Sequence, residues 1–378
     1  MMAMFLALPM GLSLALGAAA APAVTLNNRV PKLIPLAGAW RGAELGGQFL
    51  APSSVGGVGK LASYARHYPA TPLQVYRSFN LTLGGDVRAW VKKGGILWYN
   101  IKTSKEMSWQ TGAEGGFDAE AASWAAQVKS LAPAQVFVVI YHEPDHNICF
   151  VSKGSKQTCP KGGVPGNTPA HYRNMYANIQ DVFRNASVTN AVWVMDYSVQ
   201  IANTSFIGGP CDSESCEPAA AVAPLWPGDD RVDWVFFNAF EKGKHDGSPK
   251  RRLPVLLDEA QAVIGAVTSS SKGCHCVAGK DSRCAGCDLK SKPWGLGAFA
   301  AHGGGAKPVS LAERVRFLND AAASTANASH RRLEAYLYFD SLDSEIAVNG
   351  SAPPALDAAF RAYLGSSAFK LNDAGAPH

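Results

Sequence analysis

The amino-acid sequence predicts an α/β fold, a (β/α)8 TIM barrel in a single domain with loop insertions stapled by disulfides. Three observations lead to this prediction. Eight short apolar segments recur along the chain, each bounded by turn-forming residues, and amphipathic helical patterns lie between them. The 378 residues, 47% of them hydrophobic, suit one barrel with tails. We place the barrel domain at residues 30–366 and a flexible tail at residues 367–378.

The predicted strands are mostly continuous apolar runs, as expected of strands buried on both faces of a parallel sheet. They lie at residues 33–40, 73–79, 96–101, 136–141, 191–196, 232–238, 294–299 and 335–340. Apolar residues at helical spacing predict helices at residues 117–131, 172–183, 256–267, 311–322 and 354–364. A doubly wound open sheet is the alternative, but no glycine-rich nucleotide loop follows the first predicted strand. In a barrel, we expect the chemistry at the C-terminal ends of the strands.

The N-terminal segment predicts export from the cell. Residues 1–23 contain an apolar run followed by small residues in an Ala-x-Ala pattern, which is typical of a cleaved secretory signal peptide. No basic residue precedes the run, and an uncleaved membrane anchor is the alternative, although the run is short and is interrupted by Pro9 and Gly11. We therefore expect a secreted protein without stable membrane association. Five Asn-x-Ser/Thr sequons agree with a glycoprotein: Asn80, Asn185, Asn203, Asn327 and Asn349.

Eight cysteines lie in local groups within loop-like sequence. The groups are Cys149 with Cys159, Cys211 with Cys216, and Cys274, Cys276, Cys284 and Cys287. In an oxidising compartment this pattern indicates disulfides that hold long loops. A zinc site formed by the last four is the alternative, although their spacing is not a common finger pattern.

The net charge of +5 comes without a basic stripe interleaved with aromatic residues, so we expect no nucleic-acid partner. The sequence carries no signal of oligomeric state.

The segment VFVVIYHEPDHN delivers a carboxylate directly after the fourth predicted strand. Glu143 stands where a barrel places its catalytic groups, and its aromatic neighbours favour the protonated form that a general acid needs. The alternative is a structural carboxylate in the turn at Pro144. His142 either orients Glu143, binds a substrate hydroxyl or is a framework histidine. We interpret Asp145 and His146 as loop residues.

Two further residues are candidates for binding substrate. Trp109 follows the third predicted strand in the glycine-rich stretch SWQTGAEGGFD, a position that suits stacking on a sugar face. Its alternative role is a lid over the core. Arg77 lies at the end of the second predicted strand.

Eight stretches, in order, resemble glycoside hydrolase family 26, whose best-known members are β-mannanases. They are RSFN, ILWYNIK, WQTGAEGGFDAEAASWAAQV, VFVVIYHEPDHN, AVWVMDYS, LWPGDDRVDWVFFNAF, KPWGLGAFAAH and LEAYLYFDS, and they span roughly residues 33–345. The resemblance implies a barrel, a β-linked polysaccharide as substrate, no cofactor, and retaining hydrolysis by two glutamates. The family's acid/base glutamate follows a histidine at the end of the fourth strand, and His142 and Glu143 match this pair.

The sequence departs from the family where the nucleophile should stand. The family's stretch resembles P-W-x-x-G-E-F-G at the end of the seventh strand, whereas this chain reads PWGLGAFA and places Ala298 at the glutamate position. A tyrosine that hydrogen-bonds the nucleophile is usual after the sixth strand, and this chain has Phe240 there, which we expect to contact the substrate. Retaining hydrolysis needs two carboxylates about 5 Å apart, and alanine cannot form a glycosyl-enzyme.

Three interpretations remain open. A substitute carboxylate acts in place of the nucleophile, with inversion through a water, and the candidates at strand ends are Asp196, Glu241 and Asp340. Alternatively, Asp196 and Asp340 bond neighbouring strand ends and Glu241 lies in an exposed loop. In the second interpretation the protein is a pseudoenzyme that binds polysaccharide without cleaving it. In the third, the chain is a nonfunctional variant or carries an error at this position.

Overall fold

The computed structural model describes residues 40–44, 75–79, 83–92, 96–101, 107–151, 157–159, 164–198, 222–241, 251–268, 274, 286–301, 309–324, 330, 333–339 and 352–365. The predicted signal segment, the C-terminal tail and Asp340 lie outside these residues, as do the sequons at Asn80, Asn203, Asn327 and Asn349.

A parallel sheet forms the centre of the molecule, and its hydrogen-bonded order closes as β1-β10-β9-β8-β7-β4-β3-β2. The strands are β1 (Trp40–Glu44), β2 (Val75–Phe79), β3 (Ile96–Ile101), β4 (Val136–Ile140), β7 (Ala191–Ser198), β8 (Trp234–Glu241), β9 (Trp294–Ala301) and β10 (Leu333–Phe339). The seam between β1 and β2 consists of one register pair, Glu44 with Val75. The predicted parallel α/β architecture is confirmed.

The first described strand overlaps the predicted one at Trp40, and residues 33–39 of the prediction lie outside the described part of the chain. The described strand begins at Trp40, where the prediction ended it, and has the sequence WRGAE. This stretch is not a continuous apolar run, so hydrophobic patterning does not reveal it. Its strand conformation comes from parallel pairing with β10, from Trp40–Ala335 to Glu44–Phe339, and such tertiary pairing overrides local propensity.

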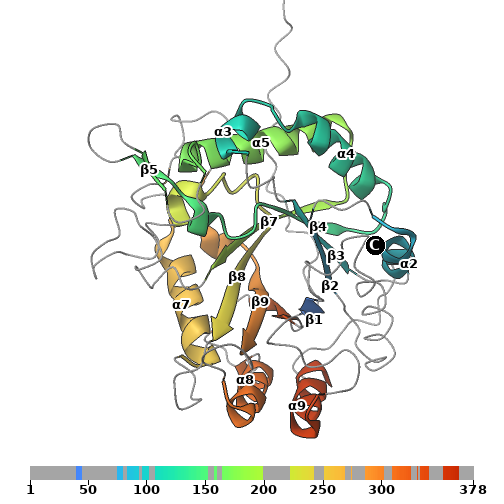
Figure 1. Ribbon diagram of the computed structural model, residues 1–378, viewed down its shortest axis with the longest axis vertical. Helices are drawn as coiled ribbons and strands as arrows, with labels where there is room; N and C mark the ends of the chain where they lie inside the picture. The colour runs from blue at the N-terminus through green and yellow to red at the C-terminus, as the bar shows by residue number, and fades with distance from the viewer. Residues whose placement is uncertain are drawn as a thin grey trace, which may run out of the picture.

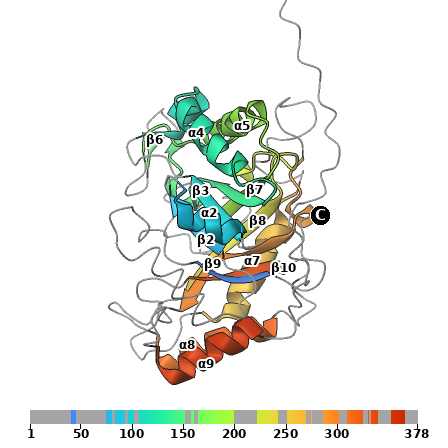
Figure 2. The same ribbon diagram turned by 90° about the vertical axis from the view of Figure 1, so that its right-hand side faces the viewer.

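Helices follow six of the eight strands within the described part of the chain. They are α2 (Gly85–Lys92), α3 (Trp109–Ala113), α4 (Asp118–Lys129), α5 (Pro169–Asn185), α7 (Leu253–Ala266), α8 (Leu311–Ser324) and α9 (Pro354–Gly365). Figure 1 shows them around the strands, and Figure 2 shows α4 with α5 on one side of the sheet and α8 with α9 on the opposite side. All five predicted helices are present, whereas α2 and α3 were not predicted.

Alternation along the strands separates two apolar regions. Inward positions form a cluster inside the sheet: Ile96, Trp98, Phe137, Val139, Val192, Val194, Trp234, Phe236, Ala335 and Leu337. The opposite faces pack against the helices in a larger core. At the next inward position toward the C-terminal ends, β3, β7 and β8 carry Asn100, Asp196 and Asn238, each at most 1% exposed. A layer of polar side chains therefore lies inside the sheet, on the C-terminal side of the apolar cluster.

Disulfides link Cys149 to Cys159 and Cys274 to Cys287. The first closes the loop after β4 that carries the short antiparallel pair β5 (Phe150–Val151) and β6 (Gln157–Thr158). The zinc alternative is wrong, because Cys274 and Cys287 are joined to each other. The remaining four cysteines lie outside the described residues. Among the helices that the structure describes, none has both the length and the apolar character needed to cross a membrane.

Candidate functional site

The backbone at the end of β4 is held in an unusual conformation. Tyr141 (φ 62°) and Glu143 (φ 51°) both lie in the left-handed region, which non-glycine residues seldom adopt. The N–H of Tyr141 donates to the carbonyl of Ile101 at 2.8 Å, and the N–H of Glu143 donates to the carbonyl of Asp196 at 3.0 Å. Hydrogen bonds from the strands on both sides thus fix a strained turn. Such strain is concentrated at functional sites, where the surrounding structure maintains it.

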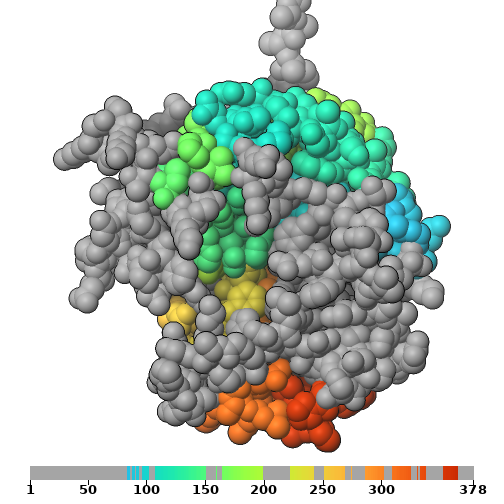
Figure 3. All heavy atoms as spheres, viewed as in Figure 1, coloured from blue at the N-terminus to red at the C-terminus, as the bar shows by residue number. Residues whose placement is uncertain are grey.

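Three side chains surround the carboxylate of Glu143. Asn238 Nδ2 donates to Oε1 at 3.1 Å. Oε2 lies 3.7 Å from His142 Nδ1 and 3.6 Å from His146 Nδ1. The Glu143 side chain is 19% exposed, so the carboxylate still reaches solvent. In Figure 3 the green segment after β4 and yellow atoms from the β8 part of the chain meet near the middle of the face viewed.

His142 lies between two carboxylates. Its Nδ1 faces Glu143, and its Nε2 lies 3.8 Å from Asp196 Oδ2. Asn238 Nδ2 is 2.8 Å from the same Nε2. Because an amide nitrogen only donates, this Nε2 accepts and the ring carries its proton on Nδ1, toward Glu143. The sequence placed Asn238 at the end of the sixth predicted strand but gave it no role in the site. The available signal was a single amide in the run VFFNAF at a strand end.

Ala298 is adjacent to this cluster but adds no functional group. It is fully buried in β9 and pairs in register with Asn238, after an irregularity that offsets the two strands by one residue. Gly297 makes the close approach possible, since a Cβ there would lie 2.9 Å from Asp196 Oδ1 and 3.0 Å from Asn238 Oδ1. The position predicted to have lost the nucleophile therefore lies beside the amide that binds Glu143.

The three candidate substitute carboxylates have different surroundings. Asp196 belongs to the cluster, but its side chain is 0% exposed. Glu241 is the last residue of β8 and is buried at 1% exposure, so the exposed-loop alternative is wrong. Strand alternation places Glu241 on the face of β8 opposite Asn238. Asp340 follows β10, outside the described residues.

The structure separates the predicted substrate-binding residues. Trp109 is 0% exposed, and its ring meets Tyr141 and Tyr172 edge to face at 5.3 and 5.0 Å. The proposed sugar stacking is wrong for this residue, which serves the alternative role in the core. Phe240 is partly buried and packs against the outer core. Arg77 belongs to β2, and its side chain lies outside the described part of the structure.

Asp145 is more than a loop residue. Its side chain is 0% exposed, and its two carboxyl oxygens accept from the N–H of Ser198 in β7 at 3.2 and 3.4 Å. Burial raises the pKa of this carboxyl to about 7; His146 lowers it and Glu143 raises it. Asp145 lies in the loop after β4, as expected, and its side chain anchors the short turn η2 (Pro144–Asn147) to the sheet beside Glu143.

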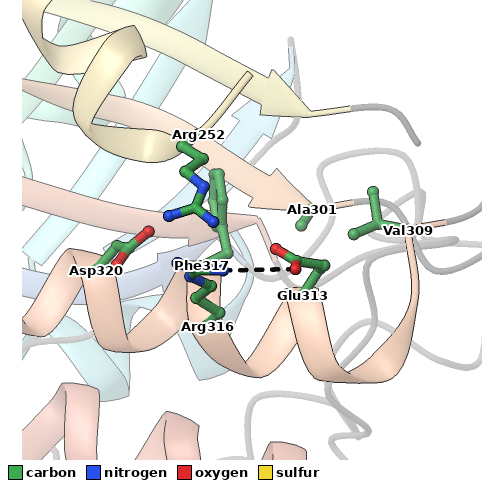
Figure 4. Close-up of a pocket in the computed structure, with 7 residues that line it drawn as sticks. All are labelled: Arg252, Ala301, Val309, Glu313, Arg316, Phe317 and Asp320. Carbon is green, nitrogen blue, oxygen red and sulfur yellow. Dashed lines mark ion pairs between the residues drawn. The ribbon is translucent and has the colours of Figure 1, made fainter. Parts of the chain in front are cut away.

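A small pocket lies away from this cluster, between α8 and the end of β9 (Figure 4). Two positive and two negative residues line it: Arg252 and Arg316 face Glu313 and Asp320 (Figure 4). Arg316 pairs with Glu313 at 3.7 Å. These charged groups balance one another, and we take the Glu143 cluster as the candidate functional site.

Comparison with solved structures shows the fold of glycoside hydrolase family 26 mannanases. A modular endo-β-1,4-mannanase of this family from Cellulomonas fimi matches with a TM-score of 0.53 and 14% identity, over 88% of this chain and 72% of that chain. The family 26 catalytic domain from Bacillus sp. JAMB-750, an endo-β-1,4-mannanase, gives 0.53 and 12%, over 86% and 85%. The family 26 domain of an endo-β-mannanase/endo-β-glucanase from Prevotella bryantii gives 0.50 and 12%, over 90% and 92%.

The chain therefore has the fold of these mannanases, and the expected resemblance to family 26 is confirmed at the level of the fold. No protein-family model and no curated protein sequence matches the chain.

Proposed function

We propose that this is a secreted, single-domain glycoside hydrolase that cleaves a β-linked polysaccharide, foremost β-mannan, with Glu143 as the general acid/base. The arrangement of Glu143 at the end of β4, bound by Asn238 and flanked by two imidazoles, carries the proposal. It lies where barrel enzymes hold their catalytic groups. Two disulfides support an oxidising compartment, and the sequon residue Asn185 is exposed at the end of α5.

In this proposal Glu143 protonates the glycosidic oxygen as the bond to the sugar breaks. Asn238 fixes Oε1, so the carboxyl keeps one orientation through the reaction. Water must then attack the anomeric carbon from the other face, with a second carboxylate as base. Asp196 is the one candidate that the described residues place in the cluster, behind His142. A water-mediated attack of this kind inverts the anomeric configuration.

A second candidate function is polysaccharide binding without cleavage. Ala298 favours it, because this position offers no carboxylate to the cluster. The complete burial of the Asp196 side chain favours it as well, since a base must contact the attacking water. The same C-terminal ends of the strands then form a glycan-binding surface.

The test measures soluble products released from β-mannan, mixed-linkage glucan and xylan by the secreted, glycosylated protein. Glu143→Gln, Asp196→Asn and Ala298→Glu are compared with it, and Glu114→Gln, an exposed glutamate in contact with Gln110, is the matched control. If the proposal holds, the native protein cleaves one polymer. Glu143→Gln then lowers the rate by about 100-fold or more, Asp196→Asn lowers it strongly, Glu114→Gln leaves it unchanged, and the first product has inverted configuration.

Binding to immobilised β-mannan without products supports the second function, especially if Ala298→Glu gains activity. Absence of both cleavage and binding on all three polymers refutes both proposals.

A further inference from the structure

A second carboxyl–imidazole pair, Asp145 and His146, lies directly behind Glu143. His146 Nδ1 is 3.6 Å from Glu143 Oε2, and His146 Nε2 is 3.6 Å from Asp145 Oδ2. The turn of η2 fixes this geometry, because the N–H of His146 and the amide of Asn147 both donate to the carbonyl of Glu143, at 3.2 and 3.3 Å. One imidazole therefore spans the gap between two carboxyl groups.

The three groups differ in their access to solvent. The side chain of Asp145 is 0% exposed, that of Glu143 19% and that of His146 31%. A proton on Asp145 is thus shielded from water, whereas His146 has an edge in solvent. The N–H of Ser198 and the backbone N–H of Asp145 itself both donate to the buried carboxyl, and burial raises its pKa in spite of them.

The groups facing this pair come from three elements. On η2 and the turn before it, Asp145 faces His146 and Glu143. From α5 and β7 it faces Tyr172 and Tyr197, whose pKa values burial raises well above 10.0, so both remain neutral.

Glu143 itself faces His142 and His146, together with the uncharged amide of Asn238 from β8. Asp196 of β7 lies beyond the His142 ring.

We propose that Asp145 and His146 form an internal proton relay that reloads Glu143 from the buried aspartate. Its use in catalysis rests on the proposed hydrolase function, whereas the coupling of the three groups does not. The sequence did not predict that Asp145 or His146 would exchange a proton with Glu143.

The step conserves protons and charge. Glu143 begins as a carboxylate after protonating a leaving group, Asp145 holds a proton on Oδ2, and His146 is neutral with its proton on Nδ1. The Nδ1 proton passes to Glu143 Oε2, and the Asp145 proton passes to Nε2. Glu143 becomes neutral, Asp145 becomes the carboxylate, and the imidazole changes tautomer without gaining charge. Solvent then returns a proton through the exposed edge of His146.

The two separations of 3.6 Å are longer than a hydrogen bond through which a proton passes directly. Catalytic hydrogen bonds are often long in the free enzyme and tighten when ligand binds. Proton transfer therefore requires both separations to shorten when a ligand binds.

The experiment follows the titration of Asp145 by carboxyl ¹³C NMR in the full-length protein, with no polysaccharide present. The native pKa is expected at about 7. His146→Gln removes an imidazole whose protonated form lowers this pKa, so the pKa should rise. Glu143→Gln removes a like charge and should lower it. Each change is expected to be about 1 pH unit, as for charges within a few ångströms. Asp181→Asn, on α5 and paired with Arg184 at 3.0 Å, is the matched control and should leave it unchanged.

Opposite shifts in the two variants show the coupling of the three groups that the relay requires, because loss of packing alone would not produce them. Shifts of the same sign, or none in either variant, overturn it. If His146→Gln does not fold, His146→Asn takes its place, and Glu143→Gln alone still refutes the proposal by raising the pKa or leaving it unchanged. The titration uses no substrate, so it is independent of the hydrolysis assay. If no polysaccharide is cleaved but the titrations are coupled, the hydrolase function is rejected and the coupling of the three groups stands.

Discussion

Replacing the buried acid Asp145 by asparagine should stabilise the protein at alkaline pH and have little effect at acidic pH. Asn keeps an oxygen that accepts from the N–H of Ser198 and has nearly the same volume. The difference between the two residues is therefore the charge that Asp145 acquires when it ionises in a fully buried position. Few substitutions in this chain isolate one physical quantity so cleanly.

The magnitude follows from the difference between the folded and unfolded pKa. Burial raises the pKa of Asp145 from 3.8 to about 7. A group whose pKa is raised on folding binds its proton more tightly in the folded state, so its contribution to stability is present below the unfolded pKa and is lost as pH rises toward the folded pKa. At 1.36 kcal/mol per pKa unit, the native protein should lose roughly 4 kcal/mol between about pH 4 and about pH 8 through this residue.

Urea unfolding of the native protein and Asp145→Asn, with disulfides intact, measures the effect. The difference in free energy of unfolding between the two proteins should change by roughly 4 kcal/mol between about pH 4 and about pH 8, in favour of the variant at high pH. Asp181→Asn, on the surface of α5, should show no such change. A difference that stays constant within about 0.5 kcal/mol across this range would refute the assignment of a buried, proton-binding carboxyl.

Three other predictions concern packing and cross-links. Gly297→Ala should lower the free energy of unfolding by about 1–3 kcal/mol through overpacking, because its Cβ would meet two buried oxygens at 2.9 and 3.0 Å; Gly265→Ala, in a helix with its nearest neighbour at 4.0 Å, should raise it by about 0.5–1 kcal/mol. Trp109→Ala should lower it by about 3–5 kcal/mol in urea unfolding. Double replacement of Cys149 and Cys159 by serine should lower it by about 2–3 kcal/mol, and a non-reducing peptide map should show the native link.

The sequence was informative wherever local patterning and burial agree. Continuous apolar runs marked β3 and β4 nearly to the residue, because strands buried on both faces leave no polar interruption. The position of Glu143 followed from the same run, since the first charged residue after a buried strand stands at its C-terminal end. These inferences need only the order of residues along one element.

The remaining features depend on contacts between elements. Trp109 follows a strand in a glycine-rich stretch, as a ligand-binding residue would, but rings from two other segments enclose it. Asn238 is a single amide at a strand end, and its importance comes from a hydrogen bond to Glu143, two strands away in the sheet. Asp145 looked like part of a turn because its partner, Ser198, is 53 residues away. Contacts between residues that are far apart in the sequence leave no periodic pattern along a single helix or strand.

The polar groups of this site come from neighbouring strands, whereas a retaining glycosidase has two carboxylates that face each other across the substrate. β4, β7 and β8 are consecutive neighbours in the sheet, and they supply Glu143, Asp196 and Asn238. β9, where the family resemblance expects the nucleophile, supplies Gly297 and Ala298, and its close approach leaves little room beside the two buried oxygens. Because Ala298 is 0% exposed, restoring a glutamate at position 298 requires the packing around it to open as well as a charge to be added. A gain of activity in Ala298→Glu would show that the buried polar groups can rearrange to accept a carboxylate. A loss of folding in that variant would indicate that the packing around position 298 does not admit a larger side chain. Any chemistry would then depend on groups from the neighbouring strands.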